Sequence, residues 1–349
     1  MNKKLLIINR SIKGNNDGPE IILDSIFQIV DYHEYDICTG YKIYQTDEHI
    51  HNKLKLPFVN IHKELFFLFK NYKRIRSYKK ILIFTYYSSP VLLMFLKILK
   101  LLNTQISIVG YDSFYRENII KMKKHTNKIK MLPYFIKSML LKFIEYLASI
   151  ACDNIYLVSE KCIKFSRERI NHRAPYKHFP IIPVINKKLV NDNKNFDKKR
   201  ILIIGPFRTE IDIIDLLKNL ELISKLDFIE RIDFFGENSE KAKSFSKYPG
   251  SIYTYVDDFD AFFSKNESIV LYNRVNTPGI QTKLQKILMY NNLVYCHKDI
   301  DVGVYLNHLL TDINKISDVP QNKKQLKLED IENALNNTLS DFKTISKDF

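Results

Sequence analysis

The chain has 349 residues, of which 45% are hydrophobic and 27% charged, with only 9 glycines and 11 prolines. This composition excludes a disordered or repeat protein, and the length predicts two globular domains. The net charge of +15 is unevenly distributed, because residues 51–200 hold 31 lysines and arginines against 9 aspartates and glutamates. We therefore expect one basic region, suited to anionic lipid, nucleic acid or a phosphate-bearing substrate.

Short apolar runs alternate with helix-like stretches along the chain. The first half predicts, in order, 5–8 (strand), 19–30 (helix), 81–85 (strand), 90–102 (helix), 106–110 (strand), 133–150 (helix) and 154–158 (strand). Residues 186–199, rich in Asn, Lys and Asp, predict a linker. Beyond it follow 201–204 (strand), 211–226 (helix) and the strands 232–235, 252–256, 269–272 and 293–296. This alternation predicts an α/β fold of two Rossmann-like domains, residues 1–185 and 200–349.

Several classes of protein and site are not expected. The cysteines are scattered, which favours reduced thiols in a cytoplasmic chain over a disulfide framework or a zinc site; they are Cys38, Cys152, Cys162 and Cys296. The apolar stretch 81–102 is divided by Pro90 and interrupted by Lys97 and Lys100, so we expect no membrane-spanning helix. The acidic run 257–260 is interpreted as solvated acid before a helix, and no bound metal is expected.

Three loops that follow predicted strands are candidate binding sites, because ligands of parallel sheets bind beyond the carboxyl ends of the strands. The first begins at Gly14, and an ordinary turn explains it equally well. The second holds Gly205 and Arg208, a pair suited to an anion at a helix N-terminus; an ordinary strand-helix turn with a solvated arginine explains it equally well. The third runs from 273 into a helix near 280, where unpaired amides favour a phosphate; its donors are Gly279, Gln281 and Lys283. A plain helix start with a surface lysine is the alternative reading.

Taken together, these segments resemble glycosyltransferases with the GT-B fold, especially the large retaining group called family 4. Gly279, Gln281 and Lys283 are similar to that family's G-x-Q-N-K helix start. The other similar segments, in chain order, are EYLASIACDNIYLVSEKCIKF (145–165), HFPIIPVIN (178–186), ILIIGPF (201–207) and IDFFGEN (232–238), the last with Gly236. The resemblance covers roughly residues 1–300. It implies two domains facing across a cleft, with a nucleotide-sugar donor in the second domain and no cofactor.

The sequence departs from the family's pattern at three places. Lys286 stands where the family usually has a glutamate that contacts the donor, and Ile211 or a neighbour stands where a lysine often clamps the diphosphate. Lys286 therefore either binds an anionic feature of the donor, or donor recognition has moved elsewhere. Tyr111 and Asp112 replace a histidine after the strand 106–110. We interpret Gly14 and Tyr111 as acceptor-side residues and Asp112 as a general base, with helix capping as the alternative for Asp112.

The leading hypothesis is a metal-independent glycosyltransferase, hexosyl or related, acting in surface glycan biosynthesis. It would move a sugar from a nucleotide-sugar donor, bound by Gly205, Arg208, Gly236 and the 279–286 segment, to a lipid-linked polysaccharide or oligosaccharide. The alternative is a non-catalytic GT-B-like subunit that binds a glycan or a partner. A nucleic-acid partner is not expected, because no recognised nucleic-acid motif accompanies the positive charge.

Two basic and apolar segments predict attachment to the inner face of the cell membrane. Residues 65–69 are aromatic and apolar and precede a dense run of lysines and arginines at 70–80. The predicted helix 133–150 is apolar and carries Lys137 and Lys142. Peripheral membrane binding requires both hydrophobic and electrostatic contacts, which both segments offer. The alternative is that the apolar residues are core and the lysines a solvated face.

Overall fold

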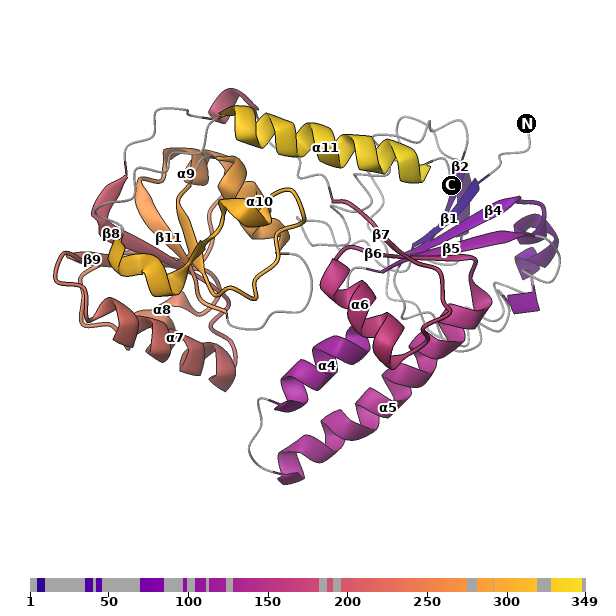
Figure 1. Cartoon of the computed structure of the whole chain (residues 1–349), viewed down its shortest axis with the longest axis horizontal. Coiled ribbons are helices and arrows are strands. Elements are labelled where there is room, and N and C mark those ends of the chain that lie inside the picture. The colour runs from indigo at the N-terminus through magenta and orange to yellow at the C-terminus, as the bar shows by residue number, and fades with distance from the viewer. Residues whose placement is uncertain are drawn as a thin grey trace. The chain divides into compact units, whose positions relative to one another are not determined.

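The computed structural model shows two compact units (Figure 1). It describes residues 5–9, 35–39, 42–45, 70–84, 97–98, 104–110, 113–123, 128–181, 187–190, 196–274, 281–290, 292–318 and 328–346. The first unit comprises Met1–Ile182 and Thr338–Phe349, and the second comprises Pro183–Asn337. The predicted helix 19–30 lies outside the described residues, as does most of the predicted helix 90–102.

The first unit is built on a seven-stranded sheet in the order β3-β2-β1-β4-β5-β6-β7. Its strands are β1 (Leu5–Asn9), β2 (Tyr35–Thr39), β3 (Lys42–Gln45), β4 (Lys80–Phe84), β5 (Gln105–Gly110), β6 (Asn154–Leu157) and β7 (Tyr176–His178). All neighbours are parallel except β2 and β3, which form an antiparallel pair. The four predicted strands of this unit are confirmed, because apolar runs such as β6 are buried on both faces.

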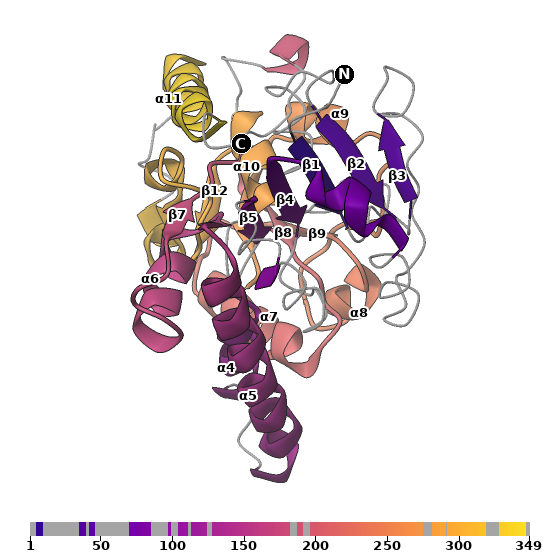
Figure 2. The same cartoon turned by 90° about the vertical axis from the view of Figure 1, so that its right-hand side faces the viewer.

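Helices cover this sheet and project from it. They are a helical stretch at 70–76, α4 (Phe114–Lys123), α5 (Lys128–Ala151) and α6 (Glu160–Arg169). In Figures 1 and 2, α4 and α5 lie side by side and extend away from the sheet. The predicted helix 133–150 is confirmed, although α5 starts earlier and Pro133 lies inside it rather than in its first turn.

The second unit contains a six-stranded parallel sheet in the order β10-β9-β8-β11-β12-β13. The strands are β8 (Asp197–Ile204), β9 (Arg231–Phe235), β10 (Ile252–Tyr253), β11 (Ser268–Tyr272), β12 (Val294–Cys296) and β13 (Thr311–Asp312). The helices are α7 (Glu210–Ile223), α8 (Ser239–Lys243), α9 (Phe259–Lys265), α10 (Thr282–Met289) and α11 (Leu328–Ser346), with 3₁₀ turns at Lys187–Leu189, Asn307–Leu309 and Ile313–Asp318.

Strand β8 shows why both faces of this sheet are covered. Ile201 and Ile203 belong to a buried cluster that includes Leu216 and Leu220 of α7. The alternating residues Leu202 and Ile204 belong to the opposite cluster, which includes Leu284, Ile287 and Leu288 of α10. Successive side chains of a strand point to opposite faces, so one apolar run supplies two cores. The predicted α/β class with two Rossmann-like domains is confirmed.

The structure differs from the sequence-based prediction at several boundaries, and the predicted strand 252–256 is shortened to β10. β8 begins at Asp197, inside the predicted linker 186–199. Of the segment 178–186 that resembles the family, only His178 lies in a described strand, the short edge strand β7. The second unit ends at Asn337 instead of running to 349, because the last turns of α11, from Thr338 on, belong to the first unit. In the described part of the chain, no helix combines the length and apolarity needed to cross a membrane.

Candidate functional site

Three backbone segments meet tightly at the carboxyl ends of β9, β8 and β11. The Gly205 amide donates to the Phe235 carbonyl at 3.1 Å, and the Asn273 amide donates to the Ile204 carbonyl at 2.8 Å. A Cβ atom on Gly205 would lie 2.9 Å from the Asn273 Cβ. A Cβ on Gly236, whose φ is +131°, would lie 2.0 Å from the Gly205 carbonyl oxygen. Glycine is therefore required at 236, and the two glycines form a close-packed floor.

The loop from β8 to α7 is fixed at both ends. The Phe207 ring is fully buried and packs edge-on against Phe234, with ring centroids 6.2 Å apart. Thr209 caps α7 in a reciprocal capping box, in which its hydroxyl accepts from the Asp212 amide and the Asp212 carboxylate accepts from the Thr209 amide. These contacts hold Arg208 in a short exposed turn at the helix N-terminus. There Arg208 forms an ion pair with Glu237, and both side chains are largely exposed.

Asp212 connects this loop with the end of β11. Its buried carboxylate accepts from the amides of Arg208 at 3.2 Å and Thr209 at 3.0 Å, and from the Thr209 hydroxyl at 2.9 Å. Its other oxygen lies 3.4 Å from Nε of Arg274. The Asn273 side-chain amide donates to the Asp212 carbonyl oxygen at 2.9 Å. One buried acid thus positions Arg274, the second residue after β11.

Arg274 is a candidate that the sequence analysis missed. Its side chain is 37% exposed, and its Nε faces the Asp212 carboxylate. The available signal was its position one residue after Asn273, at the carboxyl end of a predicted strand. An arginine there suits an anionic ligand for the same reason as Arg208.

The start of α10 is joined to the same strand end through Tyr272. The Tyr272 hydroxyl donates to Oε1 of Gln281 at 2.6 Å. Burial raises the pKa of Tyr272 to about 12, although the neighbouring Arg274 cation acts in the opposite direction, so the hydroxyl keeps its proton at neutral pH. The backbone N–H of Gln281 donates to the backbone carbonyl oxygen of Asp301 at 2.7 Å. Lys283 is exposed in the first turn of α10. Gln281 and Arg274 therefore share the environment of one tyrosine.

Asn219 of α7 forms a second set of polar contacts, with the residues that directly follow β11 and β12. The buried Asn219 side chain donates to Asn273 Oδ1 at 3.1 Å, and its own Oδ1 lies 3.3 Å from Nε2 of His297. Burial lowers the pKa of His297, with nearby carboxylates, Asp215 first, opposing this shift. These contacts tie β12 to α7 and β11, and so stiffen the same edge of the sheet.

Lys286 lies one turn farther along α10 and has a partner of its own. Its ammonium nitrogen is 3.1 Å from a carboxylate oxygen of Asp260, the first-turn acid of α9. It also lies 5.8 Å from the centre of the Phe259 ring. The Lys286 side chain is only 16% exposed, so this cation belongs to the packing between α9 and α10. Asp258 of the same acidic run caps α9 by accepting from the Ala261 amide at 2.9 Å.

Reversing the charge at Lys286 tests whether it contacts a donor. We expect Lys286→Glu to lower the free energy of unfolding by about 1–3 kcal/mol, because a glutamate would face Asp260 in a mostly buried position. Nucleotide affinity should change by less than about threefold. Lys286→Met, which keeps the apolar stem without the charge, is the control. A loss of nucleotide affinity in both variants at unchanged stability would place Lys286 in the site.

The structure brings together five of the seven residues predicted for the donor site, while a sixth, Lys286, pairs with Asp260. Gly205, Gly236 and Arg208 lie on adjoining strand ends, and Gln281 and Lys283 begin the helix linked to them through Tyr272. Gly14, Tyr111, Asp112 and Gly279 lie outside the described residues. Within the described part of the chain, no group of three or more His, Cys, Asp or Glu side chains could hold a metal ion.

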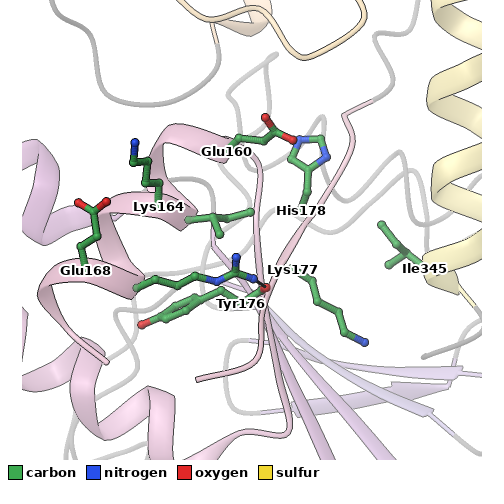
Figure 3. Close-up of a pocket in the computed structure, with 9 residues that line it drawn as sticks. Glu160, Lys164, Glu168, Tyr176, Lys177, His178 and Ile345 are labelled. Atoms are coloured by element: carbon green, nitrogen blue, oxygen red, sulfur yellow. Dashed lines mark hydrogen bonds between the residues drawn. The ribbon is translucent and has the colours of Figure 1, made fainter. Parts of the chain in front are cut away.

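A separate pocket of about 670 Å³ lies in the first unit, between α6, β7 and the end of α11 (Figure 3). It contains none of the predicted site residues and is lined by Glu160, Ile163, Lys164, Arg167, Glu168, Tyr176, Lys177, His178 and Ile345. Arg167 donates to the Tyr176 carbonyl at 2.6 Å along its wall. Its charged side chains are of both signs and mostly exposed, so the pocket indicates no particular ligand.

Comparison with solved structures identifies the architecture. A glycosyltransferase from Rickettsia africae ESF-5 aligns with a TM-score of 0.57 at 12% identity, covering 98% of this chain and 95% of that one. Anabaena Alr3699/HepE in complex with UDP-glucose aligns with a TM-score of 0.57 at 10% identity, covering 98% and 96%. The chain has the GT-B fold. A sucrose-phosphate synthase from Thermosynechococcus elongatus shares it, with a TM-score of 0.53, 11% identity and coverage of 99% and 93%.

The comparisons support the GT-B fold but no narrower classification. No known family model matches the sequence, and no curated protein matches it. At 10–12% identity the structural likeness establishes the fold alone. Membership of the retaining family 4 stays a prediction.

Proposed function

We propose that this GT-B protein is a glycosyltransferase whose nucleotide-sugar donor binds in the second unit, at the carboxyl ends of β8, β9 and β11. The observation that carries the proposal is the Gly205–Gly236 floor with Arg274 held beside it by Asp212. Similar folds include Alr3699/HepE, whose structure holds UDP-glucose. The close-packed floor fixes the strand ends in place, and an arginine held beside them is suited to recognising a diphosphate.

The chemistry requires stabilisation of a leaving phosphate. In glycosyl transfer the bond between the sugar C1 and the phosphate oxygen breaks, a bond from C1 to an acceptor hydroxyl oxygen forms, and the acceptor proton passes to a base. Negative charge develops on the departing diphosphate. The N-termini of α7 and α10, together with Arg208, Arg274 and Lys283, supply positive potential at this position without a metal. The exposed Arg208–Glu237 pair contributes little to stability, so Arg208 is able to exchange this partner for a phosphate.

We also propose roles for residues beyond the described part of the chain. Gly279 opens the α10 segment toward the diphosphate, Gly14 and Tyr111 contact the acceptor, and Asp112 takes the acceptor proton if the configuration inverts. A base on the face opposite the leaving group is required for inversion. Unchanged turnover in Asp112→Asn would remove this role.

The acceptor that we propose is a lipid-linked glycan at the inner face of the cell membrane. The basic bias of residues 51–200 supports this, and in the described segment 70–79 the cations Lys70, Lys73, Arg74, Arg76 and Lys79 are exposed. The aromatic stretch 65–69 lies outside the described residues. Exposed cations attract a surface of anionic lipid over a distance of about a Debye length, ~10 Å.

A donor screen tests the function. The full chain is incubated with UDP-, GDP- and CMP-linked sugars, and release of the free nucleotide is measured with and without a lipid-linked acceptor. We expect release from one donor class, stimulated by acceptor and unaffected by EDTA. Nucleotide binding without release from any donor, with every acceptor tried, would favour a non-catalytic subunit. No binding at all would contradict the donor site itself.

A further inference from the structure

Helix α5 carries a continuous apolar face whose described side chains are exposed. Seven large side chains on this helix are between 44% and 62% exposed: Leu132, Phe135, Ile136, Met139, Leu140, Phe143 and Tyr146. At about 100° per residue they fall within an arc of about 140° around the helix axis. Scattered exposed apolar residues are ordinary on a protein surface, but a contiguous apolar patch of this kind marks a contact surface.

The opposite face of α5 is fully packed, which fixes the orientation of the apolar face. Ser138, Leu141, Glu145 and Ala148 are buried. The Asn118 side chain of α4 donates to Ser138 Oγ at 2.7 Å, and the Ser113 hydroxyl and Tyr115 amide donate to the Glu145 carboxylate at 3.0–3.1 Å. These buried polar contacts are specific, so α5 cannot rotate to bury the exposed side chains in its own unit.

Charge on α5 is of one sign wherever the helix meets solvent. Its only acidic residue is Glu145, which is buried. Lys137 and Lys142 are exposed, and they lie about 60° and about 20° beyond the two edges of the apolar arc. An apolar stripe bordered by lysines is the pattern of a helix that lies in the plane of a membrane surface, where the stems extend along the lipid and the ammonium groups reach the headgroups.

We propose that α5 lies in the surface of an anionic bilayer, with the seven side chains of the apolar face entering the acyl boundary and Lys137 and Lys142 contacting acidic headgroups. In both views α4 and α5 project from the sheet of their unit (Figures 1 and 2). The inference rests on the membrane attachment proposed above and identifies α5 as the segment that makes it. It does not depend on the donor site.

A second copy of the chain is a less suitable occupant. Pairing two α5 helices through their apolar faces would bring the bordering lysines of one copy near those of the other. The helix offers no exposed carboxylate to compensate them, and like charges along such a seam are destabilising. An anionic lipid surface instead offers negative headgroups that pair with Lys137 and Lys142.

Vesicle flotation of the full chain tests the inference. Phosphatidylcholine vesicles with and without phosphatidylglycerol are compared at low and high salt. We expect binding to the anionic vesicles that weakens with salt. Lys137→Gln with Lys142→Gln should weaken it about 25-fold, since each lysine near an anionic surface contributes about fivefold. Ile136→Glu with Met139→Glu should weaken it roughly 100-fold or more, because both exposed side chains would enter lipid as charges.

A matched control lies on α7, where Ile214 and Leu217 have the same three-residue spacing and are 50% and 46% exposed. Ile214→Glu with Leu217→Glu should leave vesicle binding unchanged. The inference is overturned if the unaltered chain ignores anionic vesicles at low salt, or if the α5 and α7 variants bind alike. It is also overturned if sedimentation shows a dimer that the α5 glutamates dissociate. Nucleotide affinity, measured on the same variants, reports on the donor site separately.

Discussion

Replacing Gly236 with alanine should abolish nucleotide binding and lower the free energy of unfolding by about 3 kcal/mol or more. The new methyl carbon would lie 2.0 Å from the Gly205 carbonyl oxygen, on a backbone whose φ of +131° no alanine readily adopts. Backbone rather than a flexible side chain blocks it, so β8 and β9 must separate at the proposed diphosphate site. Denaturant unfolding followed by circular dichroism measures the loss, and calorimetry measures the affinity.

Glu237→Ala provides the matched control for that loss. It changes the next residue in the same loop, and it removes only an exposed ion pair with Arg208. Exposed pairs contribute about 0–1 kcal/mol, so its stability should stay close to that of the unaltered chain. If Gly236→Ala were as stable as Glu237→Ala and bound nucleotide normally, the close-packed floor would not be part of a site.

The second large effect is expected at Arg274. Arg274→Ala should lower the affinity for a nucleoside diphosphate roughly 10- to 100-fold, the equivalent of one or two charge-assisted hydrogen bonds. Asp212→Asn should act in the same direction, because the neutral amide holds Arg274 less firmly and disturbs the capping box of Thr209. Asp212 is thus a positioning residue, and its variant should lose stability as well as affinity, whereas Arg274→Ala should lose mainly affinity.

Arg200 supplies the control for Arg274. It is 35% exposed and pairs with the buried Asp233 at 3.1 Å, which closely matches the 37% exposed Arg274 and its buried partner Asp212. Arg200 lies toward the amino ends of the strands, where its neighbour in register is Arg231, the first residue of β9. Arg200→Ala should therefore change stability by a similar amount and leave nucleotide affinity unaltered. Equal affinity in the two variants would exclude Arg274 from the donor site.

The sequence predicted those parts of the fold that rest on uninterrupted apolar runs. The runs that became β4, β6 and β11 are short and buried on both faces, which is typical of parallel strands. The hairpin β2–β3 was not predicted, because its first strand contains Asp36. In the structure this acid is buried, accepts from the Tyr78 hydroxyl and faces Arg74 at 3.6 Å. A polar residue whose partners lie about 40 positions away cannot be distinguished from a loop residue by local pattern.

In the candidate site too, residues in a local sequence pattern were predicted, and a residue that depends on contacts distant in the sequence was missed. Gly205 and Gln281 were predicted because each stands between a strand and a helix, and that context is local. Arg274 was missed because only the sheet order, with β11 beside β8, brings it to Asp212. The sequence left open whether Lys286 binds the donor or whether donor recognition has moved elsewhere. Its partner Asp260 lies on a different helix, and this pairing supports donor recognition elsewhere in the site.

Calorimetric titration of the full chain with UDP, GDP and CMP tests the central claim most directly. We expect saturable binding of one of these three nucleotides. We also expect stabilisation of the fold by about 2.7 kcal/mol at a ligand concentration one hundred times the dissociation constant. Binding should be weakened in Arg274→Ala and retained in Arg200→Ala. Absence of heat and of any thermal shift with every nucleotide, in a chain shown to be folded, would contradict a donor site at the ends of β8, β9 and β11.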